Sequence, residues 1–314
     1  MQTRKRLNEA YDAAEVVEVD ASSRLVFISD AHRGDGSISD EYTKNRHVFV
    51  AALQHYFDEG FTLVEHGDSD DLWEFPFRHI YKANPLSFAL LRRFHEAGRY
   101  RRLYGNHDMQ LADPEYVRKN LYEQRDHLSG RLEPFLSGLE VREALLLRHR
   151  VTGQEILTVH GHQGDFANDH GWRYSMFTFR IFWRYLHALG IRSPSSPTRN
   201  SFKRHKVERN YVRWIRSRGI ALICGHTHRE RFPTGNDAPY FNSGGCTYPN
   251  YITGLELVDD TMSLVTWRVV PDANGYLHVA RRIVAGPRPI AEFDLHPNPA
   301  RHRRPGKKLD WSTR

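Results

Sequence analysis

ALICGHTHRERF, residues 221–232, is the stretch from which the fold of this chain can be worked out. Four apolar residues run directly into Gly225, and two histidines, His226 and His228, follow. A short apolar run that ends at a glycine predicts a buried strand leaving a sheet. Side chains two apart in an extended segment point the same way, so the two histidines are candidate metal ligands. Alone, the pair also fits two solvated histidines in a turn, so its partners elsewhere in the chain matter.

Four further apolar runs of this kind lie earlier in the chain, and helix-like segments separate most of them. The segment 41–60 has a suitable length for a helix and ends at Gly60, a plausible C-terminal stop. This alternation favours an α/β layered fold. After residue 237, β-branched and aromatic runs predict consecutive antiparallel strands that extend the first sheet or stack on it. The five predicted strands before that point are residues 24–29, 61–66, 100–105, 155–160 and 220–225.

The composition is that of a globular protein, because 39% of the 314 residues are hydrophobic and can build a sizeable core. The two cysteines, Cys224 and Cys246, exclude a disulfide framework and argue against a thiolate zinc site. The N-terminal residues are charged and lack the apolar region of a signal peptide. No stretch of the sequence approaches the roughly eighteen apolar residues of a membrane span. We therefore expect a cytoplasmic protein with no transmembrane segment.

Polar residues collect at the carboxyl end of each of the five predicted strands. In an open α/β sheet, the loops at the carboxyl ends of the strands converge on one crevice. We therefore expect five clusters that are far apart in the sequence to meet in one site. The residues are Asp30 and His32 after the first strand; Gly67, Asp68 and Asp71 after the second; Gly105, Asn106, His107 and Asp108 after the third; His160, Gly161 and His162 after the fourth; and Gly225, His226 and His228 after the fifth.

The chemistry of these side chains indicates a metal centre. Asp, His and Asn supply oxygen and nitrogen donors, which suit Mn, Fe, Zn, Ni or Co rather than Ca, whose sites use oxygen ligands. Seven such residues are too many for one tetrahedral ion. They fit two ions roughly 3.5–4 Å apart that share a bridging carboxylate, an arrangement that clamps an in-line displacement at phosphorus. The pattern predicts two divalent transition-metal ions, and manganese is favoured.

The ordered set of motifs resembles the calcineurin-like metallophosphoesterase superfamily. The motifs are D-x-H at 30–32, G-D-x-x-D at 67–71, G-N-H-D at 105–108, H-G-H at 160–162 and G-H-T-H at 225–228. The resemblance implies an α/β fold in which a β-sandwich of two mixed sheets is flanked by helices. It also implies a metal-dependent phosphoesterase, with phosphodiesterase and pyrophosphatase activities in its range, in which a hydroxide that bridges the two metal ions attacks phosphorus.

The same resemblance assigns a role to each residue by its position in the motifs. One metal ion is bound by Asp30, His32 and His228, the other by Asn106, His160 and His226, and Asp68 bridges both. His107 stabilises the transition state or protonates the leaving oxygen, and Asp71 orients His107. The last two residues would form a general-acid dyad.

Four other residues near the motifs need separate interpretation. Arg33 either holds a substrate phosphate oxygen or is a solvated arginine. His162 either contacts a phosphate or a metal ligand, or is a hydrogen-bonded structural histidine. Asp108 is interpreted as a support for the turn or for a metal-bound histidine. Cys224 lies within a predicted strand and is interpreted as a small core residue.

One segment, residues 171–218, carries the basic character of the chain. It holds twelve Lys or Arg and one acid, which gives this segment a charge of +11. The whole chain has a net charge of +7, so the residues outside the segment have a net charge of 7 − 11 = −4. Two helix-like stretches separated by SPSSPT at 193–198 predict a helical pair between the fourth and fifth motifs. We expect a single domain at 20–285, a helical cap insertion at 166–218 over the metal crevice, and a basic, flexible tail at 286–314.

The predicted cap is rich in aromatic residues as well as arginine, and several partners fit it. An anionic amphiphile such as a lipid-linked or sugar-linked phosphate is one, with Arg204, Arg209 and Arg213 as candidate contacts. Peripheral contact with a membrane surface fits the same charge. So does a nucleic-acid backbone with stacked bases. In the remaining interpretation the aromatic residues pack on the core and the arginines face water.

The place of the cap resembles one branch of the superfamily, the UDP-2,3-diacylglucosamine hydrolases, which cleave a pyrophosphate bond. That branch typically has arginine at the position of His107 and H-G-D in place of H-G-H. We expect a hydrolase of phosphoester or pyrophosphate bonds, with an anionic nucleotide-sugar or lipid-linked phosphate as substrate. The alternatives are a nuclease-type phosphodiesterase and a non-catalytic scaffold of the same fold. A scaffold predicts a missing ligand, whereas all seven are present.

Overall fold

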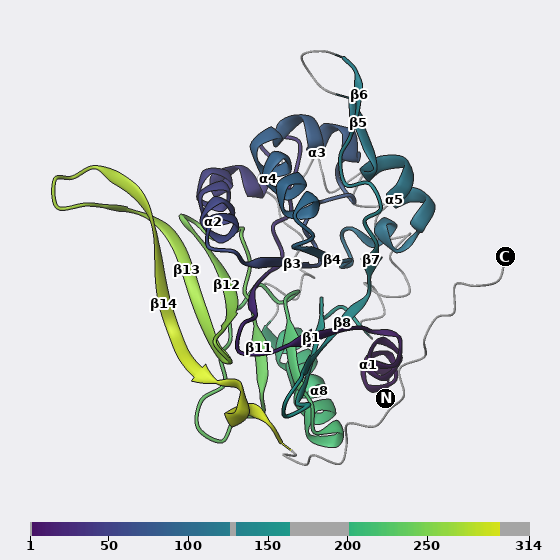
Figure 1. Ribbon diagram of the computed structural model, residues 1–314, viewed down its shortest axis with the longest axis vertical. Coiled ribbons are helices and arrows are strands. Elements are labelled where there is room, and N and C mark those ends of the chain that lie inside the picture. The colour runs from purple at the N-terminus through teal and green to yellow at the C-terminus, as the bar shows by residue number, and fades with distance from the viewer. Residues whose placement is uncertain (1, 126–129, 164–200, 296–314) are drawn as a thin grey trace.

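Two β-sheets that pack face to face form the centre of the molecule (Figure 1). The structure is a computed structural model, and it describes residues 2–125, 130–163 and 201–295, with the backbone alone at 201–204. Both sheets are mixed, and helices cover their outer faces. This is the α/β arrangement of two mixed sheets flanked by helices that the sequence predicts.

The larger sheet has seven strands and is parallel on one side and antiparallel on the other. β2, β3, β4 and β7 run parallel, whereas β12 pairs antiparallel with β2 and continues through β13 to β14. The first three predicted strands and the antiparallel run after residue 250 are therefore confirmed. In sheet order the strands are β14 (Leu277–Pro289), β13 (Thr261–Pro271), β12 (Tyr251–Val258), β2 (Arg24–Ile28), β3 (Thr62–His66), β4 (Tyr100–Leu103) and β7 (Val141–Arg142).

The smaller sheet has five strands and contains the last two predicted strands before residue 237. Only the β8–β9 pair is antiparallel in this sheet. The prediction that the run PYFNSGG joins an antiparallel series is wrong, because β11 lies parallel to β10, with Leu222 opposite Tyr240. Residues 225–239 form the crossover that a parallel pair requires. In sheet order the strands are β1 (Glu15–Val19), β8 (Ala144–His149), β9 (Glu155–Val159), β10 (Ala221–Cys224) and β11 (Tyr240–Asn242).

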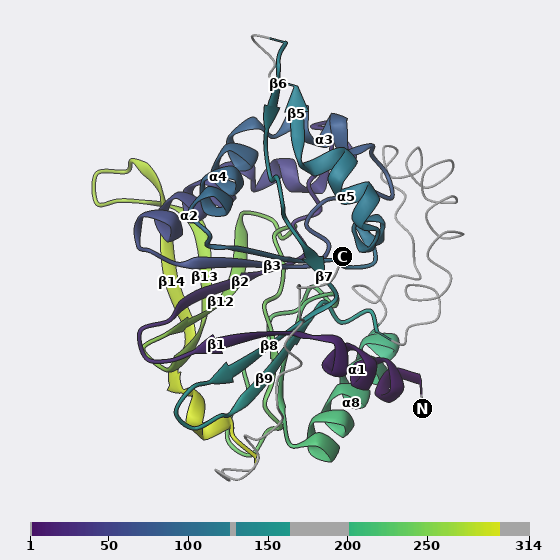
Figure 2. The ribbon, with the colours of Figure 1, turned by 45° about the vertical axis from the view of Figure 1, so that its right-hand side comes forward.

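Four layers follow from the way apolar side chains are buried (Figure 2). Between the sheets, Phe27 and Val64 of the larger sheet meet Leu147 and Ile223 of the smaller one. Strands buried on both faces explain why RLVFI and ALIC are continuous apolar runs rather than alternating ones. α2 (Arg46–Asp58) and α4 (Pro85–Glu96) cover the outer face of the larger sheet. α1 (Gln2–Ala13) and α8 (Ser201–Arg218) cover the outer face of the smaller sheet.

The remaining elements connect the strands on the side of the larger sheet. α2 follows a short 3-10 helix, η1 (Glu41–Lys44), and both lie within the segment 41–60 that the sequence predicts to be helical. A second short helix, α3, packs beside α4. The bounds of these elements are α3 (Phe77–Ala83), η2 (Met109–Ala112), α5 (Pro114–Leu121), and the ribbon of β5 (Glu123–Arg125) and β6 (Leu132–Pro134).

Both expected domain boundaries need correction. The domain begins before residue 20, because α1 buries Leu7 and β1 pairs with β8. The expected flexible tail from residue 286 begins too early, because β14 continues to Pro289 and a 3-10 helix, η5 (Ile290–Phe293), follows it. Phe293 is buried against Phe241. Residues 296–314 of the expected tail lie outside the described residues.

The expected cap at 166–218 is corrected where the structure describes it. Residues 164–200 lie outside the described residues, and α8 forms the remainder. Tyr211, Trp214 and Ile215 of α8 are fully buried against α1 and the smaller sheet. This half of the insertion is therefore a core helix that covers a sheet, because its aromatic side chains at helical spacing form one apolar stripe. None of the helices in the described ranges combines the length and the apolar character that crossing a membrane requires.

Candidate metal centre

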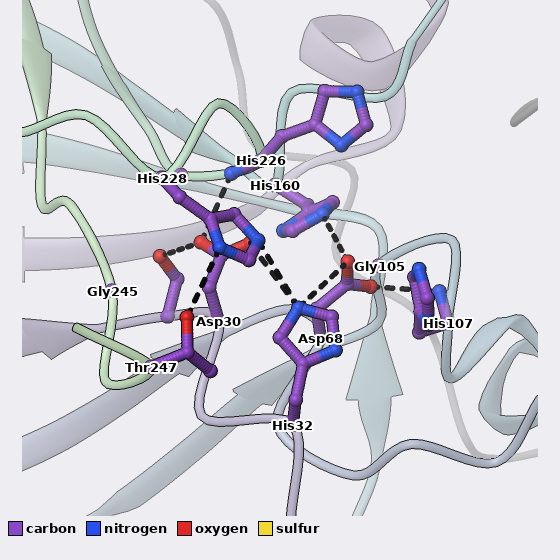
Figure 3. A network of polar contacts seen from close by, with 12 residues as sticks. Asp30, His32, Asp68, Gly105, His107, His160, His226, His228, Gly245 and Thr247 are labelled. Atoms are coloured by element: carbon purple, nitrogen blue, oxygen red, sulfur yellow. Dashed lines mark hydrogen bonds and ion pairs between the residues drawn. The ribbon is translucent and has the colours of Figure 1, made fainter. Parts of the chain in front are cut away.

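The polar loops at the ends of β2, β3, β4, β9 and β10 meet in one place (Figure 3). Three of these strands belong to the larger sheet and two to the smaller one. The loops therefore converge across the interface between two sheets rather than along one open sheet. The structure brings three ligand groups together: Asp30, His32 and His228; His32, Asp68 and His107; and Asp68, His160 and His226.

The backbone at this site is unusual. Eight non-glycine residues in the described ranges have a positive φ, and five of them are predicted metal ligands. Such conformations are uncommon and cost on the order of 1–3 kcal/mol each, and they persist where the surrounding structure enforces them. Their concentration here marks the loops as a functional site. The five residues are Asp30 (φ 52°), His32 (φ 48°), Asp68 (φ 50°), His226 (φ 64°) and His228 (φ 48°).

The first ligand group combines one carboxylate with two imidazoles. His228 Nε2 lies 3.0 Å from Asp30 Oδ1 and 3.1 Å from His32 Nε2. His32 Nε2 lies 3.9 Å from Asp30 Oδ1. The other ring nitrogen of His228, Nδ1, is 3.3 Å from Thr247 Oγ1, so the ring is held with Nε2 facing the group (Figure 3).

The second ligand group lies on the other side of Asp68. His160 Nε2 is 3.1 Å from Asp68 Oδ2, and the opposite nitrogen, Nδ1, is 3.2 Å from the His66 carbonyl oxygen. A histidine that donates Nδ1–H to a carbonyl presents Nε2 as a lone-pair donor. The ligand atoms of Asp68, His160 and His226 all lie within 4.8 Å of one another.

Asp68 faces both groups, as a bridging carboxylate must. Its Oδ2 atom is 3.1 Å from His160 Nε2 and 3.8 Å from His32 Nε2. Its Oδ1 atom accepts a hydrogen bond of 2.8 Å from the backbone N–H of His107. Gly105 permits this approach, because a Cβ atom there would lie 2.2 Å from Asp68 Oδ1.

The residues present fit a pair of metal ions. Buried polar atoms are normally hydrogen-bonded. Within the part of the chain that the structure describes, four buried side-chain atoms of predicted ligands have no hydrogen-bond partner. Nitrogen and oxygen atoms that lie close to one another at one site without a hydrogen bond are atoms that transition-metal ions would coordinate. The four atoms are Asp30 Oδ1, Asn106 Oδ1, His160 Nε2 and His226 Nε2.

The carboxylates make the site strongly attractive to positive charge. Burial lowers the pKa of His32, but the carboxylate of Asp71, 3.8 Å from His32 Nδ1, and the charge of Asp68 outweigh it and raise the pKa to about 10. Burial also acts against the protonated form of His160, whereas the charges of Asp68 and Asp30 raise its pKa to about 9. In the absence of a cation the carboxylates therefore favour the protonated form of both imidazoles.

His107 and Asp71 form the pair that the sequence predicts. His107 Nδ1 lies 3.2 Å from Asp71 Oδ1. Their side chains are 19% and 13% exposed, and His228 is 18% exposed, whereas Asp30 and His160 are completely buried. Trp73, which the sequence analysis missed, stacks on the His107 ring with centroids 4.3 Å apart and an angle of 23°. Trp73 lies only two residues after Asp71, and this proximity to the motif is the sequence feature that could have identified it.

The expectation that Arg33 contacts substrate is corrected. Arg33 is completely buried, and its guanidinium donates to Asp70 at 2.7 Å and to Glu65 at 2.5 Å. A charged group so deeply buried needs such partners. Sequence reasoning missed Glu65 and Asp70, although an acid inside the buried strand TLVEH indicates a hidden cation.

The other candidates have different surroundings. His162 is completely buried, and neither ring nitrogen has a hydrogen-bond partner among the described residues. Burial and the charge of His160 lower the pKa of His162 well below its ordinary value. Arg209 and Arg213 are exposed on α8, and the side chain of Arg204 lies outside the described residues.

Asp108 supports the loop turns, as one interpretation of the sequence holds. Its Oδ1 atom accepts a hydrogen bond of 2.6 Å from the N–H of Gly105, and its Oδ2 atom accepts one of 3.1 Å from the N–H of Ser69. The loops after β3 and β4 are therefore joined through one carboxylate. Cys224 is completely buried in β10, consistent with a core residue.

Comparisons with known proteins give structural similarity but no sequence match. Neither a protein-family profile nor a curated protein matches this chain. A dimetal phosphatase from Danio rerio is similar at 13% identity, with 85% of this chain and 100% of that chain covered and a TM-score of 0.41. The cold-active protein-tyrosine phosphatase of a Shewanella species is similar at 13% identity, with 86% and 83% covered and a TM-score of 0.41. A predicted phosphoesterase from Streptococcus pneumoniae is similar at 13% identity, with 83% of this chain and 97% of that chain covered and a TM-score of 0.32. With TM-scores below 0.5, these similarities carry no part of the functional argument.

Proposed function

We propose that this chain is a hydrolase of phosphoester or pyrophosphate bonds that works with two divalent transition-metal ions, and that it belongs to the calcineurin-like metallophosphoesterases. The observation that supports this best is the position of Asp68. Its carboxylate faces an Asp-His-His group on one side and a histidine group on the other. Two ligand groups that share one carboxylate suit a dinuclear centre for displacement at phosphorus.

The ligands divide between the two ions in this proposal. Manganese is the favoured ion, and Fe, Zn, Ni and Co also suit these donors. Two such ions polarise phosphoryl oxygens and lower the pKa of a water molecule towards neutrality. Asp30, His32 and His228 hold one ion and Asn106, His160 and His226 the other, with Asp68 shared.

His107 and Asp71 act on the leaving group in this proposal. Asp71 Oδ1 lies 3.2 Å from Nδ1 of His107 and orients the ring. Trp73 stacks on the ring and restricts its rotation. A histidine held in this way can stabilise charge on the phosphoryl group or donate a proton to the departing oxygen.

The substrate class is an anionic nucleotide-sugar or lipid-linked phosphate. The support is the basic insertion between the fourth and fifth motifs, at +11 over residues 171–218. Its exposed part on α8 includes Arg209 and Arg213, which attract large anions. A cytoplasmic setting suits the two cysteines, which are both free and buried.

A hydrolysis screen tests the proposal. The Mn-loaded protein would be assayed against phosphomonoesters, phosphodiesters, nucleoside diphosphate sugars and single-stranded DNA, with chelator-treated protein and Asp68→Ala as controls. We expect hydrolysis of nucleoside diphosphate sugars or related pyrophosphates that disappears in both controls. Preference for DNA would favour the nuclease alternative. Metal-loaded protein that cleaves nothing in the panel would favour a non-catalytic scaffold.

A further inference from the structure

A buried network of five charged side chains lies beside the ligand loops, and none of its members is a predicted ligand. Each side chain is 0% or 1% exposed. Two are cations and three are anions, so the network carries more negative than positive charge. The members are Arg33, Glu65, Asp70, Arg102 and Asp108.

Asp70 is the centre of this network, because each of its oxygens holds one guanidinium. Arg33 Nε donates to Asp70 Oδ1 at 2.7 Å, and an Arg102 terminal nitrogen donates to Asp70 Oδ2 at 2.5 Å. Arg33 also donates to both oxygens of Glu65, at 2.5 and 3.2 Å. Arg102 reaches Asp108 Oδ2 at 3.2 Å.

The network connects the three ligand loops that follow β2, β3 and β4. Arg33 comes directly after His32, and its N–H donates to the Ser69 carbonyl at 3.0 Å. Its own carbonyl accepts from the Asp71 N–H at 3.0 Å, so the first two loops are paired in the backbone as well. Asp108 accepts from Ser69 and Gly105, which ties the second loop to the third.

Stability alone does not explain such a network. Removing charges from water is costly, and replacing a buried ion pair by apolar residues is often neutral or stabilising. The ligand loops, however, hold Asp30, His32 and Asp68 in left-handed conformations that cost on the order of 1–3 kcal/mol each. Loops with such strained residues relax unless further interactions hold their backbone in place.

We propose that Asp70, with Arg33 and Arg102, is a positioning residue that sets the separation of the two metal sites. The inference rests on the proposed dinuclear function. The first loop carries ligands of one ion, the third loop carries Asn106 of the other, and the second loop carries the shared Asp68. Because the ionic network joins all three loops, it fixes the position of each ligand relative to Asp68. Loss of partners around metal ligands typically costs about 10–100-fold in metal affinity.

Asp70→Asn is the most conservative test, because it keeps the shape and removes one charge. Arg33 retains both oxygens of Glu65, and Arg102 retains Asp108. The remaining two cations and two anions balance, so the variant is expected to fold. Arg33→Lys is the second variant, since an ammonium keeps the charge but cannot span Asp70 and Glu65 as the planar guanidinium does. Glu256→Gln is the matched control.

The control is a buried carboxylate that pairs with an arginine but belongs to neither the ionic network nor the ligand loops. Glu256 is 3% exposed in β12 and accepts a hydrogen bond of 2.7 Å from Arg281 Nε of β14. β12 is the strand next to β2, and Glu256 pairs with Val26, which lies within the strand rather than in a ligand loop. Glu256→Gln therefore measures what losing a buried carboxylate partner does to stability alone.

The experiment titrates each folded protein with Mn²⁺ by calorimetry, far below its melting temperature, and records the electron paramagnetic resonance spectrum of the loaded form. We expect Asp70→Asn and Arg33→Lys to bind at least one ion about 10–100-fold more weakly and to show altered Mn–Mn exchange coupling. Glu256→Gln should match the wild type in both. Unchanged affinity and coupling in a folded Asp70→Asn or Arg33→Lys would overturn the positioning role and leave the dinuclear proposal standing. A wild-type protein that binds no Mn²⁺ would instead refute the proposed function.

Discussion

His107, like Asp71, is a site residue that the proposal assigns to neither metal ion, so its side chain can be removed without removing an assigned ligand. Its backbone N–H, not its ring, holds Asp68 Oδ1. The ring contacts Asp71, Trp73 and His32, and it lies on the more exposed side of the centre. Substitution of the ring therefore separates chemistry from metal binding.

For His107→Ala we expect full metal content and a loss of hydrolysis of about 10²–10⁴-fold on unactivated substrates. The loss should be smaller on nitrophenyl esters, whose leaving oxygen needs little protonation. Steady-state kinetics on the two substrate types, with elemental analysis of the same samples, measures both. Equal losses on the two types would rule out a leaving-group acid and leave electrostatic stabilisation as the role of this ring.

Metal binding should release protons, because the ligands hold protons when no cation is present. The pKa of His32 is raised to about 10 and that of His160 to about 9, so both are protonated at neutral pH. A metal ligand must be neutral imidazole. Calorimetry at about pH 7 in buffers of different ionisation enthalpy should therefore give a release of about two protons per chain on loading. A binding enthalpy that is independent of the buffer would contradict this.

At the scale of the elements, α8 is a basic helix whose aromatic side chains pack into the core. Trp214 is completely buried, and its Nε1 donates to Asn8 of α1 at 2.9 Å. Tyr211 donates a hydrogen bond to the Gly161 carbonyl, which links α8 to the H-G-H loop. Arg209 and Arg213 lie on the opposite, exposed side. One helix thus supports a ligand loop with its apolar face and presents charge with the other.

Trp214→Ala should lower the free energy of unfolding by about 3–5 kcal/mol, because it removes a fully buried indole and leaves a cavity. Arg213→Ala, one residue earlier but exposed, should change it by no more than about 0.5 kcal/mol. Denaturant unfolding of both variants provides the comparison. A loss of less than about 1 kcal/mol for Trp214→Ala would mean that α8 does not pack as described.

Exposed arginines on this helix should influence large substrates only. Replacing Arg209 and Arg213 by Ala together should weaken binding of nucleoside diphosphate sugars, and the effect should shrink as salt rises because salt screens exposed charges. Hydrolysis of a small nitrophenyl phosphodiester should stay near the wild-type rate. Parallel loss of both activities in the folded variant would place these arginines in the catalytic site itself.

At the scale of the whole molecule, the sequence predicts what is local and misses what depends on distant partners. The strands at 24–28 and 221–224 are predictable because each contains a continuous apolar run that ends at polar residues or, after 221–224, at Gly225. β1 is missed because EVVEV is only half-buried and owes its place to β8, far along the chain. Arg33 is misread for the same reason, since its burial depends on Glu65 and Asp70 from another strand and loop.

The candidate ligands can be found in the sequence because they directly follow five strands, with two of them after β2 and two after β10, whereas the geometry that brings them together cannot. No motif reveals that two sheets, rather than one, supply the loops, or that a buried ionic network joins three of them. These features arise only when residues as far apart in the chain as Leu25 and Thr62, or Phe27 and Leu255, pair in neighbouring strands and the two sheets pack together. The packing of the two sheets and the ionic network also explain how five predicted ligands can be kept in strained backbone conformations.

The shared carboxylate of Asp68 is the central claim, and metal stoichiometry tests it most directly. Elemental analysis of metal-replete wild-type protein and of Asp68→Ala, both checked for folding, should find about two transition-metal ions per chain in the wild type and none retained in the variant. In the proposed centre both ions depend on this carboxylate for charge and coordination. A full complement of metal in folded Asp68→Ala would contradict the dinuclear centre described here.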